Sequence, residues 1–248
     1  MPDKGLSRED LALLCKYDSP TVCNVIELFE VRPRDAGYMD AGISACFPEM
    51  PPMVGYACTA TRRCAAEARA GDTEVSLGEQ LESFDALPGA PVLVYQDLEH
   101  PSVAATFGDM MCKSYQTFGA VGLITSGAGR DLEQVRELGF PVFTNGTICS
   151  HGYGYNSAMG GPVHVGGITV VPGDLLFGDC NGVTTIPNEI ASEVAQACAD
   201  YAACEAVVLD YLSQDTPTRA ALAGAQAECK RMMAALGQRL RKGSEGSR

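Results

Sequence analysis

Apolar residues recur along the chain with two different periods, which predict alternating strands and helices. Four short runs are predicted to be strands, the first from its alternation of residue types and the others as compact apolar stretches. They are residues 53–64, 90–97, 118–127 and 141–147. Residues 76–84, 108–118 and 131–139 instead have helical spacing, and Gly139 suits the end of the last of these helices. Short connections between the elements indicate an α/β unit.

The amino-terminal region is predicted to begin with two short helices. Ser7, with Asp10 three residues later, matches a helix start, and Ser19-Pro20 opens a second amphipathic stretch. Residues 32–52 are rich in Gly, Pro and Asp, so a loop is expected between these helices and the first strand.

The residue pattern changes twice in the carboxy-terminal third of the chain. GGPVHVGGITVVPGDLLFGDCNGVTTIP, from Gly160, consists of short β-prone runs broken by turn residues, which predicts a β-meander or a barrel edge. Asn188 is then predicted to cap a long helix, and Thr216-Pro217 to begin another that runs to about Leu240. The final KGSEGSR is predicted to be disordered.

Composition excludes several classes of protein. The 248 residues carry 18 Lys and Arg against 31 Asp and Glu, a formal net charge of -13, so neither nucleic acid nor an anionic membrane is expected as a partner. The first residues lack the pattern of a secretory signal, and no run approaches the roughly 18 apolar residues of a membrane span, so we expect a cytoplasmic protein. Eleven cysteines without a CxxC pair fit neither a zinc cluster nor a disulfide scaffold.

The candidate chemistry lies in FGDMMCKSYQTFGAVGLITSGAGRD, which contains Asp109 and the adjacent pair Arg130 and Asp131. A guanidinium fixed beside a carboxylate suits a site that holds an anionic substrate together with a divalent metal. Asp131 stands at a strand-to-helix turn, where one carboxylate can ligate magnesium whose remaining ligands are substrate oxygens and water.

Four motifs in order resemble the RraA-like family, which includes the 4-hydroxy-4-methyl-2-oxoglutarate/4-carboxy-4-hydroxy-2-oxoadipate aldolases. They are LPGAPVLVYQD, the spacing of Asp109 to Arg130-Asp131, GFPVFTNGT and GGITVVPGDLLFGDCNGVTTIP. The resemblance runs from about Gly55 to about Val208. Two positions depart from the family pattern, with Ser126-Gly127 where Asp-Gly is usual and Cys180-Asn181 where an acidic doublet is common, which puts the substrate's identity in doubt.

The resemblance implies an α/β fold of the swivelling β/β/α sandwich type, with helical N- and C-terminal extensions. The implied organisation is an extension over residues 1–54, a catalytic core over 55–210, and a C-terminal helix and tail over 211–248. It also implies a homotrimer or homohexamer, and a lyase using Mg²⁺ or Mn²⁺ that splits pyruvate from a 4-hydroxy-2-oxo acid or decarboxylates oxaloacetate. The implied partners are a small 2-oxo acid and further copies of the chain.

Family roles carry over residue by residue. Asp131 is the expected metal ligand, Arg130 the expected catalytic residue that also binds substrate, and Asp109 the group that positions or deprotonates a catalytic water. The backbone amides of Gly108, Asp109, Met110 and Met111 are expected to hold the substrate carboxylate. Glu205 is expected to reach, through water, toward the metal of a neighbouring subunit.

Each assignment has a structural alternative. Asp131 also fits a helix N-cap, Arg130 a surface ion pair with Glu133 or Asp109, and Glu205 the solvated face of a helix. His151 and His164 are interpreted as structural histidines.

For the whole protein, the alternative function is a non-enzymatic regulator, since the founding member of the family binds and inhibits ribonuclease E. The acidic composition of this chain would suit a basic protein partner. The Arg130-Asp131 pair favours the enzyme, because a protein-binding member needs no metal ligand there. A methyltransferase is disfavoured, because no glycine-rich nucleotide turn follows a first strand.

Overall fold

The computed structural model describes residues 5–246, which divide into two compact units. The sheet unit contains Ala36–Asn188 and the short segment ending at Leu6, and the helical unit contains Ser7–Asp35 and the chain from Glu189 onward. The N-terminal helices therefore group with the C-terminal ones. Residues 36–54, expected in an N-terminal extension, belong to the sheet unit. The catalytic role of residues 55–210 remains a prediction.

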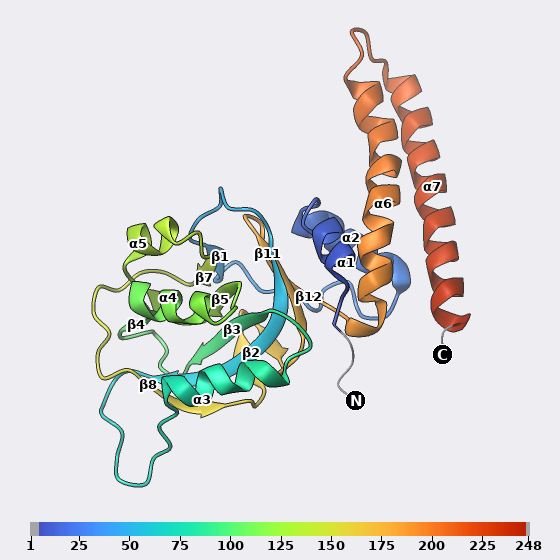
Figure 1. Ribbon diagram of the computed structural model, residues 1–248. Helices are drawn as coiled ribbons and strands as arrows, with labels where there is room; N and C mark the ends of the chain where they lie inside the picture. The colour runs from blue at the N-terminus through green and yellow to red at the C-terminus, as the bar shows by residue number, and fades with distance from the viewer. Residues whose placement is uncertain (1–4, 247–248) are drawn as a thin grey trace. The chain divides into compact units, whose positions relative to one another are not determined.

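An eight-stranded mixed sheet forms the centre of the sheet unit (Figure 1). Its path is β1 (Ser44–Ala45), β7 (Val142–Thr144), β5 (Gly122–Thr125), β3 (Pro91–Asp97), β2 (Met53–Arg63), β11 (Leu175–Asp179) and β12 (Gly182–Ile186), and β8 (Tyr155–Met159) also pairs with β2. β2, β3, β5 and β7 are parallel to one another, whereas β1, β8 and β11 join the sheet antiparallel. The predicted alternation of strands and helices is confirmed for this parallel part.

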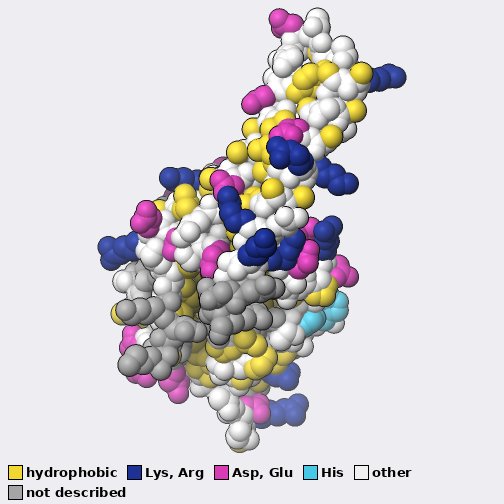
Figure 2. Space-filling model, turned by 90° about the vertical axis from the view of Figure 1, so that its right-hand side faces the viewer, with side chains coloured by type: hydrophobic (Ala, Val, Ile, Leu, Met, Phe, Trp, Pro, Cys, Tyr) yellow, Lys and Arg dark blue, Asp and Glu magenta, His cyan; other side chains and the backbone are white. Residues whose placement is uncertain are grey.

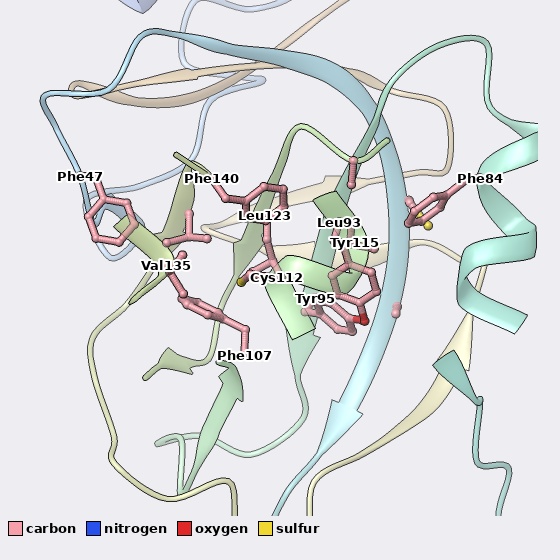
Figure 3. Close-up of a cluster of buried hydrophobic side chains, with 14 residues drawn as sticks. Phe47, Phe84, Leu93, Tyr95, Phe107, Cys112, Tyr115, Leu123, Val135 and Phe140 are labelled. Carbon is pink, nitrogen blue, oxygen red and sulfur yellow. The ribbon is translucent and has the colours of Figure 1, made fainter. Parts of the chain in front are cut away.

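Both faces of the sheet are covered, which explains the near-continuous apolar runs of its central strands. One face packs against α3 (Leu77–Glu82), the 3₁₀ turn η1 (Ser83–Ala86), α4 (Asp109–Thr117) and α5 (Leu132–Glu137). Figure 3 shows the core on this side, where Tyr95 of β3 and Leu123 of β5 meet Cys112 and Tyr115 of α4. The opposite face packs against the hairpin of β9 (Val163–Val165) and β10 (Ile168–Val170).

The region from Gly160 forms two hairpins and not one continuous meander, because β9 and β10 make a sheet of their own whereas β11 and β12 belong to the large sheet. In the second, Asp179 pairs with Gly182, so Cys180 and Asn181 form the turn, and the Asn181 amide donates to Asp179 Oδ1 at 2.8 Å. The departure from the family pattern at these two residues therefore falls in a turn.

The helical unit consists of α1 (Arg8–Leu14), α2 (Ser19–Phe29), α6 (Ala191–Leu212) and α7 (Arg219–Gly246). Ser7 accepts the amide of Asp10 at 3.0 Å, which confirms the predicted cap of the first helix. α6 and α7 pack along each other, and Figure 2 shows hydrophobic side chains exposed between charged ones on this hairpin. None of the helices in residues 5–246 combines the length and apolarity that crossing a membrane requires.

Two expectations at the C-terminal end are wrong. Asn188 does not cap the long helix, because it begins the 3₁₀ turn η2 (Asn188–Ile190) and its side-chain amide donates to the Gly173 carbonyl at 3.0 Å. The tail predicted to be disordered is helical through Gly246, since α7 continues into it. Residues 247 and 248 lie outside the described part of the chain.

Candidate active site

Two very short parallel strands bring the candidate residues together. β4 (Ala105–Phe107) pairs with β6 (Ala128–Gly129), and Phe107 stands opposite Gly129. The residue after each strand therefore begins a loop at the same edge, and the Arg130 amide donates to the Phe107 carbonyl at 3.1 Å. This pairing explains how two motifs far apart in the sequence form one site, at the carboxyl ends of parallel strands where α/β proteins commonly bind ligands.

Asp131 occupies the N-cap position of α5 but does not cap it. Its backbone is left-handed, with φ 55° and ψ 37°, and no side-chain hydrogen bond to its own helix is formed. Instead, Oδ2 accepts the backbone amide of Asp109, at the start of α4, at 3.3 Å. The capping alternative is thus wrong for this carboxylate. A left-handed backbone outside glycine is costly, and such residues concentrate at functional sites.

Arg130 forms its ion pair with Asp131, and not with Glu133 or Asp109 as the alternative expected. Arg130 Nε lies 3.5 Å from Asp131 Oδ2, and both side chains are about one third exposed, at 34% and 35%. The pair is accessible to a ligand, and the rest of the guanidinium remains available to donate hydrogen bonds.

Gly108 allows the pair to approach α4. A Cβ at this position would lie 2.5 Å from Asp131 Oδ2 and 3.0 Å from Arg130 Nε, so any side chain would displace one of these groups. Gly108 is also the N-cap of α4 and carries no capping side chain. Among the first amides of α4, that of Asp109 donates to Asp131, and that of Met110 donates to Asp109 Oδ1 at 2.7 Å. The start of this helix therefore already binds carboxylate oxygens, as a helix N-terminus favours.

These residues border a cavity of about 460 Å³. Gly108, Asp109, Met110, Met111 and Arg130 line one part of it, and Asp131 lies beside them rather than in the lining. The lining also contains residues that the sequence patterns did not single out, namely Arg62, Gln80, Ser114, Tyr115 and Asn156, together with His151, which had been interpreted as structural. The residues predicted to bind substrate, at the start of α4 and at Arg130, thus line one cavity.

A buried polar cluster adjoins the cavity, since Gln80 and Tyr115 also belong to its lining. The hydroxyls of Tyr95 and Tyr115 are 2.6 Å apart, and both contact Oε1 of Gln80. Figure 3 shows the two tyrosines next to each other. Burial is the main reason why the pKa of each phenol is raised, so both stay neutral near pH 7. Neutral phenols here provide rigid, polar walls without adding a negative charge.

Comparison with known proteins decides the family. A family model described as RraA-like, Aldolase/RraA, matches residues 22–185. The chain belongs to the RraA-like family. A protein of Halalkalibacterium halodurans named "Putative 4-hydroxy-4-methyl-2-oxoglutarate aldolase" is 32% identical over 116 residues, which are 46% of this chain and 53% of that protein. Protein DlpA of Legionella pneumophila is 34% identical over 113 residues, 45% of this chain and 18% of that protein. The chain thus matches about half the length of the first relative and less of the second.

Solved structures confirm the predicted RraA-like fold. An uncharacterized protein from Pseudomonas syringae pv. tomato superimposes with a TM-score of 0.70 at 20% identity, over 92% of this chain and 97% of that one. Streptomyces coelicolor RraAS2, described as an unusual member of the RNase ES inhibitor RraA protein family, gives a TM-score of 0.65 at 25% identity, over 82% of this chain and 97% of that one. The mixed α/β fold with helices at both ends is therefore that of RraA-like proteins.

The residues of this RraA-like chain that could hold a divalent metal are few. Within the described residues, no three His, Cys, Asp or Glu side chains converge as a metal-binding group. Magnesium, however, is often held by one or two carboxylates with water and substrate oxygens. Asp131 fits that mode, because it is partly exposed and only its Oδ2 is engaged by neighbouring groups.

Glu205, the remaining predicted catalytic residue, lies on α6 in the helical unit. There it hydrogen-bonds Tyr201, one turn earlier, whose pKa is raised to about 12 by burial first and by the Glu205 charge second. Cys229 of α7 is also near, since the same carboxylate contributes to a raised pKa of its thiol after burial. A role for Glu205 at the metal of a neighbouring subunit stays a prediction.

Proposed function

We propose that this RraA-like protein is a metal-dependent lyase that releases pyruvate from a 4-hydroxy-2-oxo acid by retro-aldol cleavage, or decarboxylates oxaloacetate. The observation that carries the proposal is the junction of β4 with β6, which joins Gly108, Arg130 and Asp131 at one edge of a cavity large enough for a small acid. A fixed cation beside a partly free carboxylate suits an anionic, metal-bound substrate.

Both reactions make the same demand on the protein. Retro-aldol cleavage breaks the C3–C4 bond as the 4-hydroxyl loses its proton, and the bonding electrons move into the enolate of pyruvate. Decarboxylation of oxaloacetate releases CO₂ and leaves the same enolate, which is then protonated at C3. The site must therefore stabilise negative charge at the 2-oxo oxygen and hold the adjacent carboxylate.

Asp131 would hold Mg²⁺ or Mn²⁺ through the carboxylate oxygen that makes no contact with Asp109 or Arg130. When bound there, the metal supplies Lewis acidity at the 2-oxo group. Arg130 donates hydrogen bonds to the carboxylate or 2-oxo oxygen, where its permanent charge favours the enolate. The amides of Gly108 to Met111 orient the C1 carboxylate, after the Asp109 side chain has left the Met110 amide.

Asp109 is assigned to position or deprotonate a water in the cavity, since it is exposed beside Arg130's loop and can accept a proton. Glu205 of a neighbouring subunit would reach the metal through a second water. This assignment requires a homo-oligomer, a trimer or a hexamer, and sedimentation of the intact protein would test that assembly.

Pyruvate release from oxaloacetate and from 4-hydroxy-4-methyl-2-oxoglutarate tests the proposed function. With added Mg²⁺, the wild type is expected to release pyruvate from at least one compound. Excess chelator is expected to abolish the release, because without the metal the site has no Lewis acid to accept the electrons of the breaking bond. The readout is coupled lactate dehydrogenase, with readdition of Mg²⁺ as the control. A protein that is inactive on both compounds would contradict the lyase and favour the protein-binding function.

Gly108→Ala is expected to lower kcat/KM by about tenfold to a hundredfold, because its methyl group must displace Arg130 or Asp131 from its position. The melting temperature should change by only a few degrees, since the atoms in the way are the ends of side chains. Gly161→Ala is the matched control, because a Cβ there meets open space. Kinetics like those of the wild type would show that the close approach at Gly108 is not needed.

A further inference from the structure

Arg62 is a buried charge on a largely apolar face of the sheet, where its register partner on β3 is the buried Asp97. Alternate residues of β2 share a face, and Cys58 and Ala60, four and two positions before Arg62, belong to the buried core shown in Figure 3. Arg62 continues this series as the last inward position of the strand and is only 9% exposed. A permanently charged guanidinium so far from water is costly unless an anion or several hydrogen bonds compensate it.

The partners of Arg62 do not compensate its charge. Nη1 donates to Asn156 Oδ1 at 3.0 Å, and the guanidinium contacts the neutral thiol of Cys64. Nε is buried with no hydrogen-bond partner. Across residues 5–246, no carboxylate forms an ion pair with this side chain. Arg63, the next residue, lies on the other face of the strand, is half exposed and pairs with Glu99 at 3.9 Å.

Arg62 faces the same cavity as the candidate active site. It lines the cavity together with Arg130, and Gln80 and Tyr115 also belong to the lining. Burial raises the pKa of Tyr115, and the positive charge of Arg62 opposes that rise, which places the guanidinium near the buried polar cluster. Gly154 makes room for it, because a Cβ there would collide with Nη2. The lining of this cavity thus contains two arginines, one from β2 and one that follows β6.

We propose that Arg62 forms a second anion subsite, which binds a carboxylate of the substrate remote from its 2-oxo end. The inference rests on the proposed function and deepens it, because Arg130 and Arg62 together would select 2-oxo acids with a second carboxylate over those with one. Arg62 then determines substrate specificity, whereas Arg130 and the residues at the start of α4 act on the reacting bond. A carboxylate is the fitting ligand, since a guanidinium can donate two parallel hydrogen bonds to it.

Two carboxylates of the protein are other candidates for the anion. One is Asp97, the register partner of Arg62, whose Oδ2 is buried without a hydrogen-bond partner, and the other is Glu74, which lines the cavity and is exposed. Were either carboxylate to turn toward Arg62 and neutralise it, the subsite would serve the fold and not the substrate. The test below separates these possibilities by comparing two substrates that share their reacting end.

The experiment measures kcat/KM for 4-hydroxy-2-oxoglutarate and 4-hydroxy-2-oxopentanoate, in which a methyl group replaces the remote carboxylate. Both release pyruvate by the same cleavage. Arg62→Gln is expected to lower kcat/KM for the dicarboxylate by about 10- to 100-fold, which is the loss of a hydrogen bond to a charged group. The monocarboxylate should lose no more than about threefold, and Arg63→Gln, the adjacent control, should leave the preference of the wild type unchanged.

Equal losses on both substrates, or none on either, would overturn the subsite while leaving the lyase intact. A wild type that releases no pyruvate would overturn the lyase, and the subsite is then decided by thermal shift. Glutarate raising the melting temperature of the wild type but not of Arg62→Gln, with butyrate shifting neither, would support an anion subsite. The same shift in both proteins would overturn it.

Discussion

Asp131→Asn is expected to lower metal-dependent pyruvate release by about a hundredfold or more, the largest effect of any single substitution in this site. The amide keeps the size of the carboxylate and can still accept the Asp109 amide, but it removes the negative charge that holds a divalent cation. The loss should appear in kcat/KM and as a much higher Mg²⁺ concentration for half-maximal rate. The measurement is a Mg²⁺ titration of coupled pyruvate release.

The left-handed backbone at Asp131 decides which variants are informative. Asn tolerates φ near 55°, whereas Ala carries a backbone penalty of about 1 kcal/mol, so Asp131→Ala would mix strain with loss of charge. Asp131→Gly removes the charge and the strain together and serves as the second variant. Both Asn and Gly variants should melt within a few degrees of the wild type. Full activity of either one would remove Asp131 from the ligand role.

The large elements of the sheet unit could be predicted because their sequence patterns match their burial. β2 and β3 are buried on both faces, so their residues are apolar almost without interruption, and α4 and α5 follow with helical spacing. Asn188 failed as a predicted cap because its side chain finds the Gly173 carbonyl, a tertiary partner that local sequence does not reveal.

The site itself was predictable only in part. β4 and β6 have three and two residues, too few for any periodic signal, so the pairing that joins Gly108 to Arg130 could not be read from periodicity. The resemblance to RraA-like proteins identified Gly108 and Arg130 as candidates, and the pairing of β4 with β6 explains why they lie close together. Arg62 carried a signal that was overlooked, because strand alternation from Cys58 and Ala60 places its charge on the inward face.

Arg130→Lys is expected to lower kcat/KM by about a hundredfold, although the charge is conserved. Arg130 faces two tasks at once, since Nε lies beside Asp131 while the other nitrogens remain free to bind the substrate. A planar guanidinium can perform both, whereas a lysine ammonium is a single point of charge on a flexible chain. If this interaction strengthens as the enolate forms, kcat should fall more than KM rises.

Arg136→Lys is the matched control for that substitution, because Arg136 lies on α5, pairs with Glu49 at 3.0 Å and stacks over Phe47 outside the cavity. Its loss of planar geometry should affect stability slightly and leave the kinetics unchanged. A similar fall in both variants would indicate that α5 merely tolerates lysine poorly. Wild-type kinetics in Arg130→Lys would mean that a positive charge at this position is sufficient. The hydrogen bonds that stabilise the developing enolate would then have to come from the amides of α4.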